Sequence, residues 1–150
     1  MTSPTARSVA LNAIRRVVEH GGYSNLVLPA ALARSDLDAR DRALASELAY
    51  GTLRRLLALD QAIGEHSTRP LDRVTPHALA LLRMGAYQLL EMRIPPHAAV
   101  SETVSLAFER ERGFVNAVLR RLADSAPAPP SGSSDADVSV RTGLTPWAVR

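Results

Sequence analysis

One helix-start signal, a hydroxyl residue followed by proline, constrains the fold of this chain most strongly. Within residues 1–123 it occurs as Ser3-Pro4 and as Thr75-Pro76. The hydroxyl can accept a hydrogen bond from a free N–H of the first helical turn, and proline suits the first helical position because no N–H is needed there. Apolar residues follow each signal at spacings of three and four, which places them on one face of a helix. We therefore expect helices that bury one face.

Helical periodicity recurs along most of the chain. The segments expected to be helical are 4–20, 25–35, 39–66 with Asp38 as its cap, 76–92, 97–111 and 114–123. In the second of these, Pro29 must lie in the first turn, or the helix must begin later. Gly51 costs about 1 kcal/mol relative to alanine inside a helix, so we expect a neighbouring helix to approach it closely. No segment shows the alternation of apolar and polar residues that is typical of a β-strand. The sequence therefore predicts an all-α fold of about six to seven helices.

The length and composition favour one main domain followed by a short remainder. A chain of 150 residues with 46% hydrophobic content can form one compact core. Residues 1–123 are expected to form that domain, because residues 124–137 hold no large apolar side chain and read as a flexible Pro/Ser-rich linker. Residues 138–150 regain apolar residues and a helix start at Thr145-Pro146, so we expect them to begin a further, truncated domain.

Several classes of site are excluded or disfavoured by the residues present. The chain has no cysteine, which excludes disulfides, thiolate catalysis and cysteine-ligated metals. Common dinucleotide, nucleotide-phosphate and zinc-protease motifs are missing, and the four histidines lack ligand-like pairing. His97 with Ser101 and Glu102 is better explained by helix-start preferences than by catalysis. We expect no catalytic or metal site, no transmembrane helix, and a cytoplasmic location.

Arginine clusters are the most promising functional signal. All 18 basic residues are arginine, and the net charge is +3. Arg112, Asn116 and Arg120 are spaced by four, so they are expected to share one helix face that could contact phosphates. The competing interpretation is a solvated helix surface on which Glu109 and Glu111 balance the arginines.

Four segments together resemble a known family. They are DRALASELAYGTLRR at 41–55, RMGAYQLL at 83–90, IPPHAAVSETV at 94–104 and GFVNAVLRR at 113–121. Residues 5–123 resemble the NusB-like N-terminal domain of the bacterial small-subunit ribosomal RNA cytosine-5 methyltransferase B family. The antitermination factor NusB shares this fold with looser versions of the last three segments.

This resemblance implies an all-helical bundle of two packed subdomains that binds RNA. In longer family members a Rossmann-like domain follows, which binds S-adenosylmethionine and attacks cytosine with a cysteine thiolate. Because this chain has no cysteine, we expect it to be catalytically inert and to bind no cofactor itself. Its predicted function is to help position ribosomal RNA for its own C-terminal catalytic domain, which is absent from the chain.

The resemblance also implies which residues contact RNA. The first-helix arginine of the family corresponds to Arg7, and the basic end of the last helix corresponds to Asn116, Arg120 and Arg121. The complete set expected to bind RNA is Arg7, Arg15, Arg16, Arg112, Asn116, Arg120 and Arg121.

Two alternatives remain open at this point. One is a stand-alone NusB-type transcription antitermination factor that binds boxA-like RNA with a ribosomal protein partner. This chain departs from that pattern, because Ser3, Pro4 and Thr5 replace a run of basic residues. The other is a structural module that packs on its own catalytic domain without touching RNA.

Overall fold

The computed structural model describes residues 4–21 and 24–125, which form helices and connecting turns with no strand among them. The seven α-helices of this part are α1 (Ala6–His20), α2 (Ser24–Arg34), α3 (Ala39–Arg54), α4 (Leu56–His66), α5 (Pro76–Tyr87), α6 (Pro96–Val104) and α7 (Glu109–Ser125). A 3₁₀ turn (Leu71–Arg73) precedes α5 and a π turn (Gln88–Met92) follows it. The predicted all-α fold is confirmed. Residues 124 and 125 of the expected 124–137 linker form the end of α7, and the rest of that linker and the segment 138–150 lie outside the described residues.

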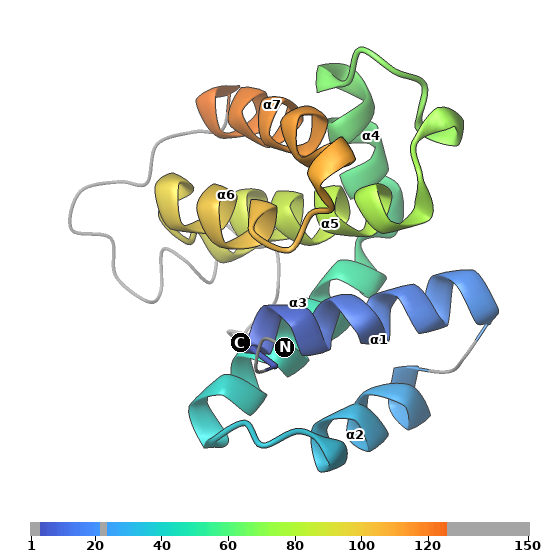
Figure 1. The fold of residues 1–150 in the computed structure, drawn as a ribbon, viewed down its shortest axis with the longest axis vertical. Coiled ribbons are helices and arrows are strands. Elements are labelled where there is room, and N and C mark those ends of the chain that lie inside the picture. The colour runs from blue at the N-terminus through green and yellow to red at the C-terminus, as the bar shows by residue number, and fades with distance from the viewer. Residues whose placement is uncertain (1–3, 22–23, 126–150) are drawn as a thin grey trace.

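The helices pack as two subdomains (Figure 1). Helices α1, α2 and α3 contact one another in the first, and α4, α5, α6 and α7 do so in the second. Helix α5 joins them, because it also packs against α1 and α3. A single cluster of buried apolar side chains runs through both subdomains, from Ile14 on α1 to Leu119 on α7.

Helix α1 begins two residues later than the Ser3-Pro4 signal predicts. Thr5 is the N-cap, and its hydroxyl accepts a hydrogen bond from Ser8 N–H at 3.1 Å. The Ser8 hydroxyl in turn accepts one from Thr5 N–H at 2.8 Å. This reciprocal capping box satisfies two N–H groups at once, which a start at Pro4 would not do. The helix ends as expected, with Gly21 in the left-handed conformation at φ 71°.

The second and third expected helices differ from the helices of the structure. Helix α2 begins at Ser24, so Pro29 lies inside the helix rather than in its first turn. The segment expected to run from 39 to 66 as one helix is two helices, α3 and α4, broken at Arg55. The break at Arg55 is not visible in the apolar spacing, because Leu48 and Leu59, on either side of it, are both buried.

Gly51 on α3 confirms the expected close approach. A Cβ added to Gly51 would lie 2.0 Å from the ring of Tyr87 on α5. The Tyr87 hydroxyl donates a hydrogen bond to Glu47, also on α3. Burial, together with this bond, raises the pKa of Tyr87 above its ordinary value. The glycine thus lets a buried tyrosine connect the two subdomains.

In the second subdomain α5 begins where the sequence predicts, but α7 begins at Glu109, five residues before the predicted start at Phe114. Thr75 caps α5 as expected, its hydroxyl accepting from Ala78 N–H at 3.2 Å. Helix α6 ends at Val104 rather than near Glu111, and α7 runs through Gly113, which was expected to separate two helices. A Cβ added at Gly113 would have no neighbouring atom within 4 Å, so no close contact with another helix requires a glycine at this position.

Candidate nucleic-acid interface

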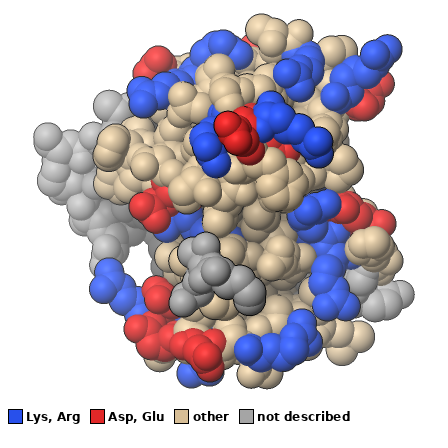
Figure 2. All heavy atoms as spheres, viewed as in Figure 1, with Lys and Arg blue, Asp and Glu red and all other residues tan. Residues whose placement is uncertain are grey.

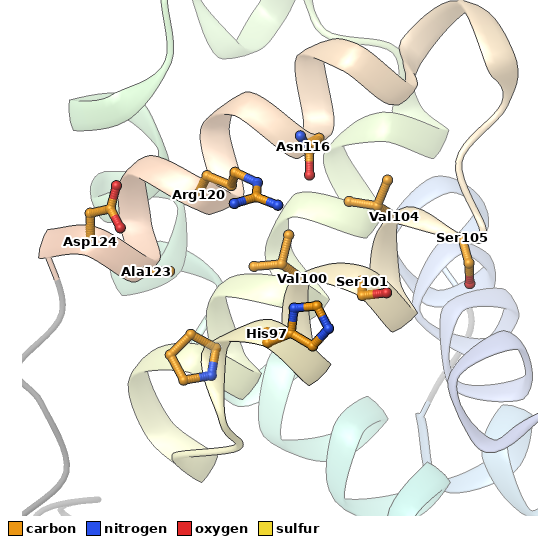
Figure 3. Close-up of a pocket in the computed structure, with 10 residues that line it drawn as sticks. His97, Val100, Ser101, Val104, Ser105, Asn116, Arg120, Ala123 and Asp124 are labelled. Atoms are coloured by element: carbon orange, nitrogen blue, oxygen red, sulfur yellow. The ribbon is translucent and has the colours of Figure 1, made fainter.

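A groove between α6 and α7 brings together two of the residues that sequence predicts to bind RNA. Asn116 and Arg120 lie on α7, one helical turn apart, and line a cavity of about 430 Å³. From α6 the groove receives His97, Ser101 and the apolar Val100 and Val104. Figure 3 shows the Arg120 guanidinium extending over the groove toward α6 and the Asn116 amide directed into it. The two helices are joined by the short turn at 105–108, which makes them antiparallel neighbours.

The polar side chains of this groove have no intramolecular hydrogen-bond partner within the part of the chain that the structure describes. This holds for Asn116, Arg120, His97 and Ser101. Asp124 lies one turn beyond Arg120 and lines the same end of the groove. Donors and acceptors that the protein does not pair are free to bind a polar ligand without first breaking a protein hydrogen bond.

Arg112 and Arg121 do not join this groove, although both lie on α7. Arg112 Nη2 donates to the carbonyl of Ala107 at 3.1 Å, in the turn before the helix. Arg121 Nε donates to the carbonyl of His66 at 2.8 Å, at the C-terminal end of α4. The expectation that Arg112 shares a binding face with Asn116 and Arg120 is therefore not realised, because its guanidinium turns back to the α6–α7 connection.

Arg7 lies between the subdomains and is half-buried. Its Nε donates to the side-chain oxygen of Gln88 at 2.8 Å, and Gln88 donates onward to the hydroxyl of Thr103 at 2.8 Å. Gln88 and Thr103 are fully buried. Burial lowers the pKa of Arg7, and the nearby carboxylate of Glu102 opposes this shift. Arg7 therefore connects α1 to the π turn and α6, a structural role that helical periodicity does not reveal.

Arg15 and Arg16 lie on α1 beside α2. Arg15 pairs with Glu19 through two contacts of 2.5 and 3.0 Å. Arg16 is exposed and lines a second cavity of about 460 Å³ together with Arg34 from α2. Figure 2 shows that arginines on the viewed face are dispersed, with acidic side chains between them, rather than gathered in one patch.

Glu111 is not a solvated surface residue that balances the charge of the arginines. The side chain is buried and accepts hydrogen bonds from Phe108 N–H at 3.0 Å and from the Thr75 hydroxyl at 3.2 Å, and it pairs with His77. Burial alone raises the pKa of a carboxyl group, but the bonds from Phe108, His77 and Thr75 outweigh it and lower the pKa of Glu111. Glu111 thus ties the start of α7 to the start of α5, and the interpretation as a solvated balancing charge is wrong.

The α6 side of the groove was not predicted from the sequence. His97 and Ser101 are spaced by four, which places them on one face of α6. That spacing was the available signal, but it does not reveal which neighbour faces it. No group of three or more potential metal ligands occurs among residues 4–21 and 24–125. Within the same ranges, none of the helices is both long and apolar enough to cross a bilayer.

Comparison with known families matches residues 4–124 to the NusB family model. The chain belongs to the NusB family. This confirms the resemblance inferred from the four sequence segments.

Two of the relatives found by sequence comparison are methyltransferases by name. A putative methyltransferase of Mycobacterium tuberculosis is 48% identical over 122 residues, which cover 79% of this chain and 27% of the relative. The ribosomal RNA small subunit methyltransferase B of Escherichia coli O157:H7 is 42% identical over 120 residues, covering 77% of this chain and 27% of the relative. The chain thus spans about a quarter of the length of these curated relatives.

The solved structure of Thermotoga maritima NusB has the same fold. Its TM-score is 0.72 at 22% sequence identity, and the match covers 86% of this chain and 96% of that one. At this identity the likeness establishes the NusB-type helical fold of the chain.

Proposed function

We propose that this chain is the RNA-binding N-terminal domain of a small-subunit ribosomal RNA cytosine-5 methyltransferase, and that it helps position the RNA substrate. The observation that carries the proposal is the match of 42–48% identity to methyltransferases over about a quarter of their length. Methylation at cytosine C5 requires a cysteine thiolate that adds to C6 of the ring, and this chain has no cysteine, so the methyl-transfer step would belong to another part of such an enzyme.

The remaining steps belong to the rest of such an enzyme. S-adenosylmethionine, the methyl donor, would be bound by the C-terminal catalytic domain, which is also a proposed packing partner of this chain. A cytoplasmic location follows from a ribosomal RNA substrate. The chain itself would contribute binding energy and orientation, which make the reaction effectively intramolecular once the RNA is held.

Two exposed arginines that have no hydrogen-bond partner among residues 4–21 and 24–125 support RNA binding by this chain. Arg120 lines the α6–α7 groove and Arg16 lines the α1–α2 cavity. Each can contact a phosphate without giving up an internal hydrogen bond, unlike Arg7, Arg15, Arg112 and Arg121. Contacts of this kind position an RNA backbone rather than read its bases.

The salt dependence of RNA binding tests this proposal. The 150-residue chain is titrated into a labelled fragment of small-subunit ribosomal RNA at about 50 and 200 mM salt, and affinity should fall steeply as salt rises. The double variant Arg16→Gln/Arg120→Gln should weaken binding and flatten the salt dependence. Unchanged affinity in this variant, with folding intact, would favour a structural module that does not touch RNA. A preference for boxA-like RNA over ribosomal fragments would favour the antitermination alternative.

A further inference from the structure

The α6–α7 groove differs in chemistry along its length. At the end near the start of α6, Arg120 supplies a permanent positive charge, with His97 across from it. At the other end the Asn116 amide faces the groove. Val100, which is 6% exposed, and the partly buried Val104 line the α6 side of the groove. A ligand that fits must therefore combine an anionic group, a weakly polar middle and a hydrogen-bonding edge.

The charge balance of the groove limits how much negative charge it accepts. Besides Arg120, the groove is lined by the carboxylate of Asp124, one turn further along the same helix. A ligand with several adjacent phosphates would meet one arginine and one carboxylate, so repulsion from the carboxylate would offset part of the attraction. A single phosphodiester, with one negative charge, fits this balance better than a triphosphate does.

The size and the polar groups of the groove favour one nucleotide. Its volume of about 430 Å³ lies near the lower end of small-ligand sites, which span roughly 300–1,000 Å³, and an RNA helix does not fit into it. The Asn116 amide offers both a donor and an acceptor, the combination that pairs with the edge of a base. In duplex RNA the Watson–Crick edges are occupied and the major groove is too narrow for side chains, so an unpaired base is the accessible target.

We propose that the α6–α7 groove holds one unpaired nucleotide of single-stranded RNA. The Arg120 guanidinium contacts its phosphate, the sugar and the base face lie along Val100 and Val104, and the Asn116 amide contacts the base edge. This inference rests on the proposed RNA-binding function and specifies which class of RNA segment this site takes.

Three ligands distinguish the possible sources of this chemistry. Binding of the 150-residue chain is measured for a single-stranded oligonucleotide, for a duplex of the same sequence, and for a free nucleoside monophosphate. We expect the single strand to bind at least tenfold more tightly than the duplex at equal salt. Adding the single strand should also shift the side-chain amide resonance of Asn116 in NMR spectra, because that amide contacts the base directly.

Variants of α7 locate the site. Asn116→Ala should weaken single-strand binding by about fivefold or more, the lower range for loss of a base-edge contact, while duplex binding changes little. Asn116→Asp keeps the side-chain volume but removes the amide donors, and should weaken single-strand binding at least as much. Arg120→Gln should reduce the slope of log affinity against log salt by about 0.7, one phosphate contact on a single strand. Arg110→Gln is the matched control, since Arg110 is exposed on α7 and does not line the groove.

The outcomes separate this inference from the proposed function. Equal affinity for single strand and duplex, with both Asn116 variants unchanged, overturns the nucleotide site and leaves general RNA binding standing. Equally tight binding of the free monophosphate at Asn116 also overturns the inference, because the ligand would then be a free nucleotide. Failure of the chain to bind any RNA overturns both. Circular dichroism of each variant excludes unfolding as the cause of lost binding.

Discussion

The start of α7 and the middle of α7 use polar side chains in opposite ways. At the start, Glu111 is buried and accepts hydrogen bonds from the starts of both α5 and α7. One and two turns further on, Asn116 and Arg120 have no partner within the described residues and line a groove. The same helix therefore holds one polar group for stability and two for binding. Satisfied and unsatisfied hydrogen bonds distinguish these roles better than charge does.

Removing Glu111 should produce the largest effect and test the stability side of this comparison. Glu111→Ala leaves the Phe108 N–H, the Thr75 hydroxyl and His77 without their acceptor, and should lower the free energy of unfolding by about 3 kcal/mol. Urea denaturation followed by circular dichroism measures the change. Glu109→Ala, an exposed neighbour in the same turn, should change stability little. Equal losses in both variants would contradict a specific role for Glu111.

The same carboxylate should contribute to the pH dependence of stability. Because its folded pKa lies below its unfolded value, Glu111 stabilises the fold above the unfolded pKa, about 4.3. That contribution is lost as pH falls through the folded pKa. In Glu111→Gln the free energy of unfolding should therefore decrease less between pH 5 and acid than in the unchanged chain.

Gly51 offers a second, somewhat smaller test at the contact between the subdomains. In Gly51→Ala the new Cβ would overlap the buried Tyr87 ring, which Glu47 holds in place, and stability should fall by about 2 kcal/mol through overpacking. The double variant Gly51→Ala/Tyr87→Leu should lose less than the sum of the two single variants. Strict additivity in thermal unfolding would show that the two residues do not interact.

Replacing Arg7 should produce the smallest loss of stability of these variants. It should also separate the structural role of Arg7 from the RNA contact proposed for Arg120. Arg7→Gln breaks the bond to buried Gln88 and should cost about 1.5 kcal/mol of stability while leaving the salt slope of RNA binding unchanged. Arg16→Gln, on the same helix but exposed, is the control and should leave stability unchanged. A reduced salt slope for Arg7→Gln would show that Arg7 contacts phosphate as well.

The sequence predicts the helices well because their signals are local. Thr75 and Asp38 cap their helices as expected, and the apolar stripe of α1 is buried as expected. Local signals fail where two interpretations compete. Thr5 rather than Ser3 caps α1 because Ser8 completes a capping box, and Gly113 lies inside α7 although glycine is typical of helix ends.

The site is only partly predictable, because it depends on contacts between helices. Spacing correctly places Asn116 and Arg120 on one face, but it equally includes Arg112, which turns back to Ala107. Spacing also cannot tell that Arg7 reaches Gln88, 81 residues away. The burial of Glu111 depends on α5 lying beside the start of α7, which no local pattern encodes.

Gly85 on α5 helps to fix the position of α7, the helix that forms one wall of the groove. Leu119, next to Arg120, packs against Gly85 of α5 so closely that an added Cβ would lie 2.8 Å from it. Since Leu119 is fully buried and Gly85 lets the two helix backbones approach, α7 cannot slide or rotate freely relative to α5. The backbone that carries Asn116 and Arg120 is thus preorganised, and a ligand needs to order only side chains. Binding would then proceed with little change of backbone shape, as a rigid-body encounter.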